Sequence, residues 1–241
     1  MKNNDPLHIL LTNDDGHQAP GIQALHRVLL QAGHRVSMVA PSTEQSATGM
    51  GVTSRRNLTL EQLEIDSWHL DGQPVDTVLV ALRHLLEDNP PDLVLSGINF
   101  GPNVGTALYM SGTIGAAIMA SLNGVPSIAV SAGMRFDEVG TTFPSTHNVL
   151  EPAAEFVCSV IESLQSSVGN NGRLLPKKVL LNVNYPALPK DQIKGVLYPE
   201  ISAGHIIDLG YHRCDETGHV VPCFYPGVNP AEPEKEDGDV R

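Results

Sequence analysis

The chain has 241 residues, enough for one sizeable α/β core or for a core with a small appendage. Its formal net charge of −12 argues against a nucleic-acid polymer as partner, because acidic surfaces repel phosphates, but a mononucleotide stays compatible with it. No apolar run is long enough to span a bilayer, and three scattered cysteines do not form a disulfide framework. These features predict a cytoplasmic protein that does not bind membranes.

The first predicted strand and the polar residues after it are the most informative stretch of the chain. Residues 9–11 (Ile-Leu-Leu) form a short apolar run, typical of a strand buried on both faces of a parallel sheet. The run leads into residues 12–16 (TNDDG), and ligands of open α/β sheets bind just beyond such strand ends. Carboxylate oxygens suit Mg²⁺ or Mn²⁺, so Asp14 and Asp15 are candidate metal ligands. The alternative is that one of them only caps the following helix.

Strand and helix patterns alternate along most of the chain. Periodicity predicts helices from Pro20 to just before Gly33 and over 75–86, 111–124 and 149–164, strands over 36–40, 93–95, 127–131 and 178–184, and a hairpin within 52–71. Such alternation is typical of a Rossmann-like α/β fold with a doubly wound, mostly parallel sheet. The chain lacks a GxGxxG motif after its first strand, which argues against a dinucleotide ligand.

Residues 96–105 (SGINFGPNVG) follow the third core strand and reach the same edge of the predicted sheet. Their glycines allow tight turns and a close approach of the backbone to a ligand. The amides of Asn99 and Asn103 are able to coordinate a cation or to bond a phosphate. The alternative is an ordinary turn-rich connection.

The next helix begins at Ser111, Gly112 and Thr113 and is rich in small residues. Free backbone amides at a helix N-terminus favour anions, so this start is a candidate phosphate site. The alternative is that Ser111 is simply an N-cap.

The character of the chain changes after residue 186. Residues 187–230 are rich in Gly, Pro, His and Tyr and predict a small irregular β appendage with short strands. Residues 231–241 predict a solvated acidic tail. The sequence therefore divides into a core over 1–186, this appendage and the tail.

Taken in order, the motifs TNDDG, APG, SATG, SGINFGPNVG and SGT resemble the SurE family of stationary-phase survival proteins. The resemblance implies a metal-dependent 5′(3′)-nucleotidase that hydrolyses nucleoside monophosphates and, in some members, short polyphosphate. It implies one Mg²⁺ or Mn²⁺ per subunit and a homodimer or homotetramer. Metal ligands carried over by motif are Asp14, Asp15, Ser46 and Asn99. In the metal-assisted hydrolysis that this set implies, Asp14 or Asp15 is the base, and the phosphate oxygens are held by Asn103, Ser111, Gly112 and Thr113.

The sequence departs from the family pattern at two places that matter. Gln45 stands where the family usually has an arginine before the loop serine, and Arg55 or Arg56 is the candidate substitute. The family's terminal strand does not follow the acidic stretch, which predicts impaired assembly and fast amide exchange beyond about residue 200. Two alternatives stay open: a C-terminally truncated, weakly active or non-catalytic member, and a nucleotide-binding protein that does not hydrolyse its ligand.

Overall fold

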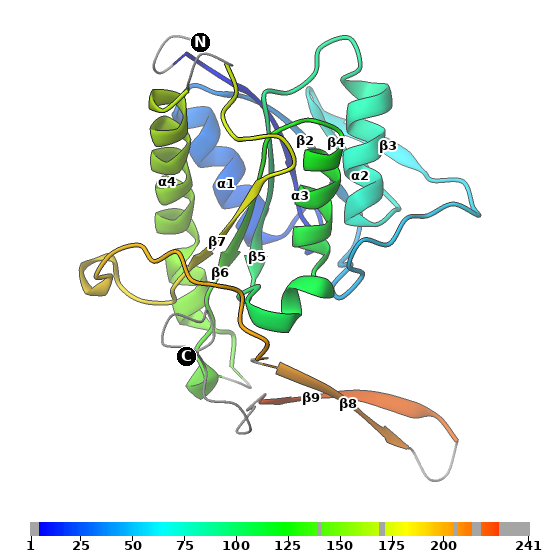
Figure 1. Ribbon diagram of the computed structural model, residues 1–241. Coiled ribbons are helices and arrows are strands. Elements are labelled where there is room, and N and C mark those ends of the chain that lie inside the picture. The colour runs from blue at the N-terminus through cyan, green and yellow to red at the C-terminus, as the bar shows by residue number, and fades with distance from the viewer. Residues whose placement is uncertain (1–4, 139–140, 169–171, 205–206, 214–217, 227–241) are drawn as a thin grey trace.

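A seven-stranded sheet forms the centre of the molecule (Figure 1). The computed structural model describes residues 5–138, 141–168, 172–204, 207–213 and 218–226. The strand order is β3-β4-β2-β1-β5-β6-β7, and neighbouring strands are parallel except for the antiparallel pair β3 and β4. The strands are β1 (His8–Thr12), β2 (Arg35–Pro41), β3 (Leu60–Glu64), β4 (Ser67–Leu70), β5 (Leu93–Phe100), β6 (Ser127–Ala132) and β7 (Leu180–Tyr185). Strand β2 lies on one side of β1 in the sheet, and β5 lies on the other side of β1. The carboxyl ends of β1 and β5 therefore flank the switch point at which such sheets bind ligands.

Helices cover both faces of this sheet. They are α1 (Pro20–Gln31), α2 (Pro74–Val80) with a π-helical turn after it (Ala81–Leu85), α3 (Gly112–Leu122) and α4 (Pro144–Ser166). Short 3-10 helices lie at Gly105–Tyr109, Phe136–Glu138 and Lys190–Gln192. Helix α1 packs beside α4 on one face, and α2 packs beside α3 on the other (Figure 1). The predicted doubly wound, mostly parallel sheet is confirmed.

The first strand is buried on both faces, as its apolar run predicted. Ile9, Leu10 and Leu11 are each 0% exposed. Ile9 and Leu11 pack in the cluster beneath α1 and α4, whereas Leu10 packs in the cluster beneath α2 and α3, because side chains alternate along a strand. Burial of each of these side chains stabilises the fold by about 1.5–3 kcal/mol. This burial fixes the position of the strand and therefore of the polar turn that follows it.

Strand β5 is longer than the sequence predicted. The apolar run indicated a strand over 93–95, but β5 continues to Phe100 because β6 stays paired alongside it. Gly97 makes this approach possible, since a Cβ atom there would lie 2.2 Å from the carbonyl oxygen of Val130. Asn99 therefore belongs to the end of a strand and is not part of a free loop.

Two hairpins complete the fold. The hairpin predicted within 52–71 is confirmed as β3 and β4, and β4 also pairs with β2 and so joins the main sheet. Beyond residue 186, β8 (Ile207–Arg213) and β9 (Val220–Pro226) form a second hairpin that extends away from the main sheet (Figure 1). The β character predicted for 187–230 is confirmed for these strands, although they are longer than expected. The tail 231–241 lies outside the described residues, and the division at residue 186 stays a prediction.

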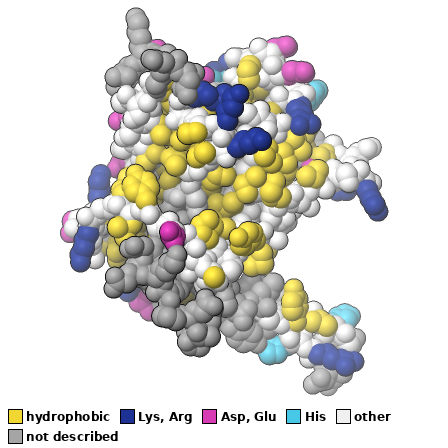
Figure 2. Space-filling model, in the orientation of Figure 1, with side chains coloured by type: hydrophobic (Ala, Val, Ile, Leu, Met, Phe, Trp, Pro, Cys, Tyr) yellow, Lys and Arg dark blue, Asp and Glu magenta, His cyan; other side chains and the backbone are white. Residues whose placement is uncertain are grey.

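One face of the molecule carries hydrophobic side chains over α3 and the β7 edge (Figure 2). Leu122, the last residue of α3, is 57% exposed, and Val179, which precedes β7, is 41% exposed. Strand β7 is the outermost strand of the sheet on this side. Apolar side chains beside an outer strand are typical of a surface that associates with another protein. Within the described ranges, no helix is both long enough and apolar enough to cross a membrane.

Candidate active site

The predicted polar residues gather at the carboxyl ends of β1 and β5. Asp14 and Asp15 follow β1 directly, and Asn99 is the next-to-last residue of β5. The two strands are hydrogen-bonded neighbours, and the backbone amide of Phe100 donates to the Oδ2 atom of Asp15 over 3.0 Å. The structure thus brings the two carboxylates beside the end of β5, at the switch point of the sheet.

Asp14 is buried against the N-terminus of α3. It is 3% exposed; its Oδ1 atom accepts a 2.6 Å hydrogen bond from the Thr113 hydroxyl, and its Oδ2 atom accepts a 3.1 Å bond from the Thr113 amide. Gly112 makes this contact possible, because a Cβ atom there would lie 2.9 Å from the Cβ atom of Asp14. The helix start predicted to bind an anion therefore already holds a carboxylate of the chain itself.

Asp15 is partly buried and lies close to Asp14. The pKa of Asp15 is raised from 3.8 to about 6, chiefly by burial and also by the charges of Asp14 and Glu44, against the lowering effect of the Phe100 amide. Burial also raises the pKa of Asp14, although its two bonds from Thr113 oppose this. Two carboxylates whose ionised forms are both disfavoured create a site that a cation would stabilise.

Ser46 lies on the exposed loop that follows β2. The backbone amide of Gln45 donates to the carbonyl oxygen of Asp14 over 2.7 Å and ties this loop to the end of β1. The Ser46 hydroxyl donates to the Oε1 atom of Glu44 over 2.8 Å, which leaves the lone pairs of its oxygen as acceptors. Glu44 thus orients the hydroxyl that the family resemblance assigns to a metal, as second-layer carboxylates commonly do.

The same loop also rests on the main chain of α3. A Cβ atom on Gly115 would lie 2.2 Å from the carbonyl oxygen of Gly49, so the helix backbone packs directly on the loop backbone. The amide of Gly49 in addition donates to the carbonyl oxygen of Met110 over 2.9 Å. Small residues in α3 therefore position both Asp14 and the loop that carries Ser46.

Asn99 stands one residue before the end of β5. Its Nδ2 atom donates to the carbonyl oxygen of Gly101 over 2.6 Å. This bond fixes the orientation of the side-chain amide and does not use its Oδ1 atom. An amide oxygen is a suitable ligand for a hard cation. The role of Asn99 as a ligand stays a prediction.

The residues predicted to hold phosphate are engaged in the protein's own contacts. Asn103 donates through Nδ2 to the hydroxyl of Ser131 over 2.9 Å, and its backbone amide donates to Oδ1 of Asn184 over 2.8 Å. The Ser111 hydroxyl accepts a 3.1 Å bond from the Ile114 amide and so is the N-cap of α3. Together with the Thr113 bonds to Asp14, these contacts position the site, and the phosphate-binding roles of Asn103, Ser111, Gly112 and Thr113 stay predictions.

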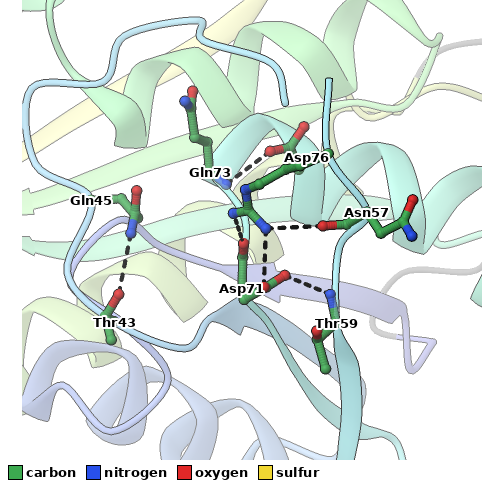
Figure 3. Close-up of polar contacts among 8 residues, drawn as sticks. Thr43, Gln45, Asn57, Thr59, Asp71, Gln73 and Asp76 are labelled. Atoms are coloured by element: carbon green, nitrogen blue, oxygen red, sulfur yellow. Dashed lines mark hydrogen bonds and ion pairs between the residues drawn. The ribbon is translucent and has the colours of Figure 1, made fainter. Parts of the chain in front are cut away.

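Of the two candidate substitutes for the family's arginine, Arg56 is engaged in contacts of its own. Figure 3 shows Gln45 beside Thr43 and Asp71 beside Thr59. Gln45 donates to the Thr43 hydroxyl over 3.2 Å. Arg56 forms a 3.0 Å ion pair with Asp71, so a phosphate contact from Arg56 would require this pair to open.

A family model described as Survival protein SurE matches residues 9–207, a range that includes every site residue predicted above. The chain belongs to the SurE family. It is 38% identical over 218 residues to the 5′-nucleotidase SurE of Carboxydothermus hydrogenoformans, covering 88% of this chain and 77% of that relative. It is 39% identical over 218 residues to the 5′-nucleotidase SurE of Thermosynechococcus vestitus, covering 88% and 76%. The crystal structure of the SurE protein of Aquifex aeolicus has a TM-score of 0.73 and 31% identity, covering 91% of this chain and 82% of that one.

The SurE site of this chain fits a hard divalent cation. The described residues contain no cluster of three or more His, Cys, Asp or Glu side chains suited to a metal, so a cation here would rely on two carboxylates and neutral oxygens. Such a donor set suits Mg²⁺ or Mn²⁺, which retain water ligands. The raised pKa values of Asp14 and Asp15 also fit a positive charge between them.

Sequence reasoning missed two residues of this SurE site. Glu44 lies in a polar loop, where no pattern singles it out, but it raises the pKa of both carboxylates and orients Ser46. Asn13 is fully buried; its Nδ2 atom donates to the carbonyl oxygen of Gly16, and its Oδ1 atom has no hydrogen-bond partner among the described residues. A buried amide oxygen in this position needs a cation, a water or a substrate donor. Its place inside the TNDDG motif was the available signal.

Proposed function

We propose that this chain is a 5′-nucleotidase that hydrolyses nucleoside monophosphates to nucleoside and phosphate. The observation that carries the proposal is the pair of adjacent carboxylates, buried Asp14 and partly buried Asp15, at the switch point of a SurE sheet. The names of the SurE relatives support the same activity. Hydrolysis of 3′-nucleotides and of short polyphosphate belongs to the same proposal and rests on the family resemblance alone.

Asp14, Asp15, Ser46 and Asn99 would hold the divalent cation. When bound, Mg²⁺ or Mn²⁺ would neutralise charge on the phosphoryl group and lower the pKa of an attacking water. Asp15 is the better candidate for the general base, because it is the less buried carboxylate and it lines the cavity at the carboxyl ends of β1 and β5. Asp14 contributes charge and is oriented by Thr113. The N-terminus of α3 holds Asp14 and so acts on the reaction through that carboxylate.

The leaving nucleoside takes up a proton as its oxygen departs, and the water that attacks the phosphorus loses one. Asp15 accepts the proton of the water, and the protonated Asp15 can then donate that proton to the departing oxygen.

The exposed apolar face at α3 and β7 supports the homodimer or homotetramer that the resemblance implies, and light scattering of the purified chain tests it.

Phosphate release from AMP by the purified chain tests the proposal. We expect turnover with Mn²⁺ or Mg²⁺, loss of turnover in EDTA, and recovery when metal is added back. AMP binding by calorimetry without phosphate release under any of these metals would favour the non-hydrolytic alternative and overturn the proposal.

A further inference from the structure

A cavity of about 320 Å³ opens beside Asp15. Its lining residues come from the carboxyl ends of β1 and β5, the loop after β2, and the N-terminal ends of α1 and α4; they are Asp15, Ala19, Pro20, Gly21, Glu44, Phe100 and His147. The volume is at the lower end of the range of small-molecule sites, about 300–1,000 Å³. The cavity therefore suits a ligand of nucleoside size and excludes a folded polymer.

The lining of the cavity has two chemical characters. Asp15 and Glu44 are acidic and belong to the reaction site described above. The residues from the start of α1 are small and apolar, and Gly21 packs so closely that a Cβ atom there would lie 2.0 Å from the carbonyl oxygen of Ile98. A ligand with one polar and one flat apolar part matches such a lining.

Aromatic rings form the remaining wall. The Phe100 ring lies 5.2 Å from the His147 ring, tilted by 51°, and 5.8 Å from the Phe143 ring in an edge-to-face arrangement. Phe100 ends β5, whereas Phe143 is the N-cap of α4 and His147 lies in its first turn. The backbone amide of Phe100 bonds Asp15, so the aromatic wall begins at the residue that contacts the reacting carboxylate.

We propose that this cavity binds the nucleoside part of the substrate, with the base against Phe100 and His147 and the sugar hydroxyls donating to Glu44. The proposal rests on the proposed nucleotidase function and names the residues that recognise the base and sugar. Bases stack on aromatic side chains through their π-faces, whichever base is present. A carboxylate is a natural acceptor for ribose hydroxyls, as it is in dinucleotide-binding folds.

Two phosphoesters that differ only in the base test the proposal. The purified protein is assayed with AMP and with ribose 5-phosphate in saturating Mn²⁺, as wild type, Phe100→Leu and His147→Ala. Phe100→Leu keeps the backbone amide and most of the apolar volume but removes the aromatic face. We expect the ratio of kcat/KM for AMP to that for ribose 5-phosphate to fall about tenfold in each variant, mainly through KM.

His84→Ala is the matched control, because His84 is also an exposed histidine on a helical turn. It follows α2 next to Arg83, which bonds Asn123 at the far end of α3 from Asp14. We expect the control to keep the wild-type ratio. Adenosine titrated by calorimetry gives a second readout that needs no turnover, and its Kd is expected to rise about tenfold in both test variants.

An unchanged substrate ratio together with an unchanged adenosine Kd in both test variants would overturn the nucleoside subsite. Equal losses of activity toward AMP and ribose 5-phosphate would also overturn it, since the cavity would then serve the phosphate or the fold. If wild type hydrolyses neither phosphoester, the proposed function fails, and adenosine binding alone then decides the subsite.

Discussion

Replacing Asp15 with asparagine should stabilise the metal-free protein while it abolishes activity. The rise in the pKa of Asp15 from 3.8 to about 6 corresponds to a cost of about 3 kcal/mol for keeping the carboxylate ionised at neutral pH. Asparagine removes that cost but buries amide hydrogens with incomplete partners, which costs about 1 kcal/mol. A net gain of about 2 kcal/mol is expected. For a chain of this size, each kcal/mol moves Tm by about 2–4 °C, so Tm should rise by about 4–8 °C.

Thermal unfolding in EDTA measures this difference, and its pH dependence provides an internal check. The folded-state pKa of Asp15 is raised, so the cost is absent below the unfolded value of 3.8, grows as pH rises and is complete above about pH 6. About 1.6 kcal/mol of the ionisation cost is present at pH 5, and the amide cost of about 1 kcal/mol does not change with pH. The advantage of Asp15→Asn should therefore be full at pH 7.5 and about a third as large at pH 5. Titrating groups that do not interact with Asp15 contribute equally in both proteins, and their effects on the difference cancel.

Excess Mn²⁺ should reverse the order of stability. A metal that binds only the folded wild type at 100 times its Kd adds about 2.7 kcal/mol, and the variant should gain much less. Asp88→Asn is the control, because Asp88 is an exposed acid and its replacement should change stability by less than about 0.5 kcal/mol. An equal or lower Tm for Asp15→Asn in EDTA at pH 7.5 would refute the reasoning.

Further substitutions separate the roles within the site. Asp14→Asn should remove most AMP hydrolysis while circular dichroism stays native, and wild-type turnover would rule out its assignment. Ser46→Ala and Asn99→Ala each remove a neutral ligand that water partly replaces, so activity should need more Mn²⁺ and return at high metal; if excess metal rescues neither, they act on substrate or structure. Gly112→Ala places a methyl group 2.9 Å from the Cβ atom of Asp14, so both Tm and activity should fall, and normal values of both would contradict that packing.

The fold was largely predictable because its signals are local. The apolar run 9–11, the helical periodicity of α1 and α4, and the alternation of strands and helices each depend on neighbouring residues. The end of β5 was not predictable in this way. Its last residues are polar and rich in glycine, and only pairing with β6 keeps them in the strand.

The residues of the candidate site that lie in a sequence motif could be predicted. Those whose role depends on tertiary contacts could not. Asp14 and Asp15 follow a buried strand, so their position could be inferred. The hydrogen bond from Thr113 to Asp14 could not be inferred from the sequence, because the two residues are 99 positions apart and meet only when α3 packs on the sheet. Glu44 and His147 carried no signal because an exposed polar residue in a loop or at a helix start has no periodicity.

The contact between Gly115 and Gly49 has a consequence for motion within the site. Because main chain rests on main chain, the loop with Ser46 and the helix that holds Asp14 should fluctuate together as one rigid body. Backbone order parameters of about 0.85 are expected for residues 46–50, although these residues lack regular secondary structure. Any side chain at position 115 would separate the two segments, whereas exposed positions in the loop are free to vary. Adaptation of this enzyme to new substrates should therefore alter the aromatic wall and leave the loop backbone unchanged.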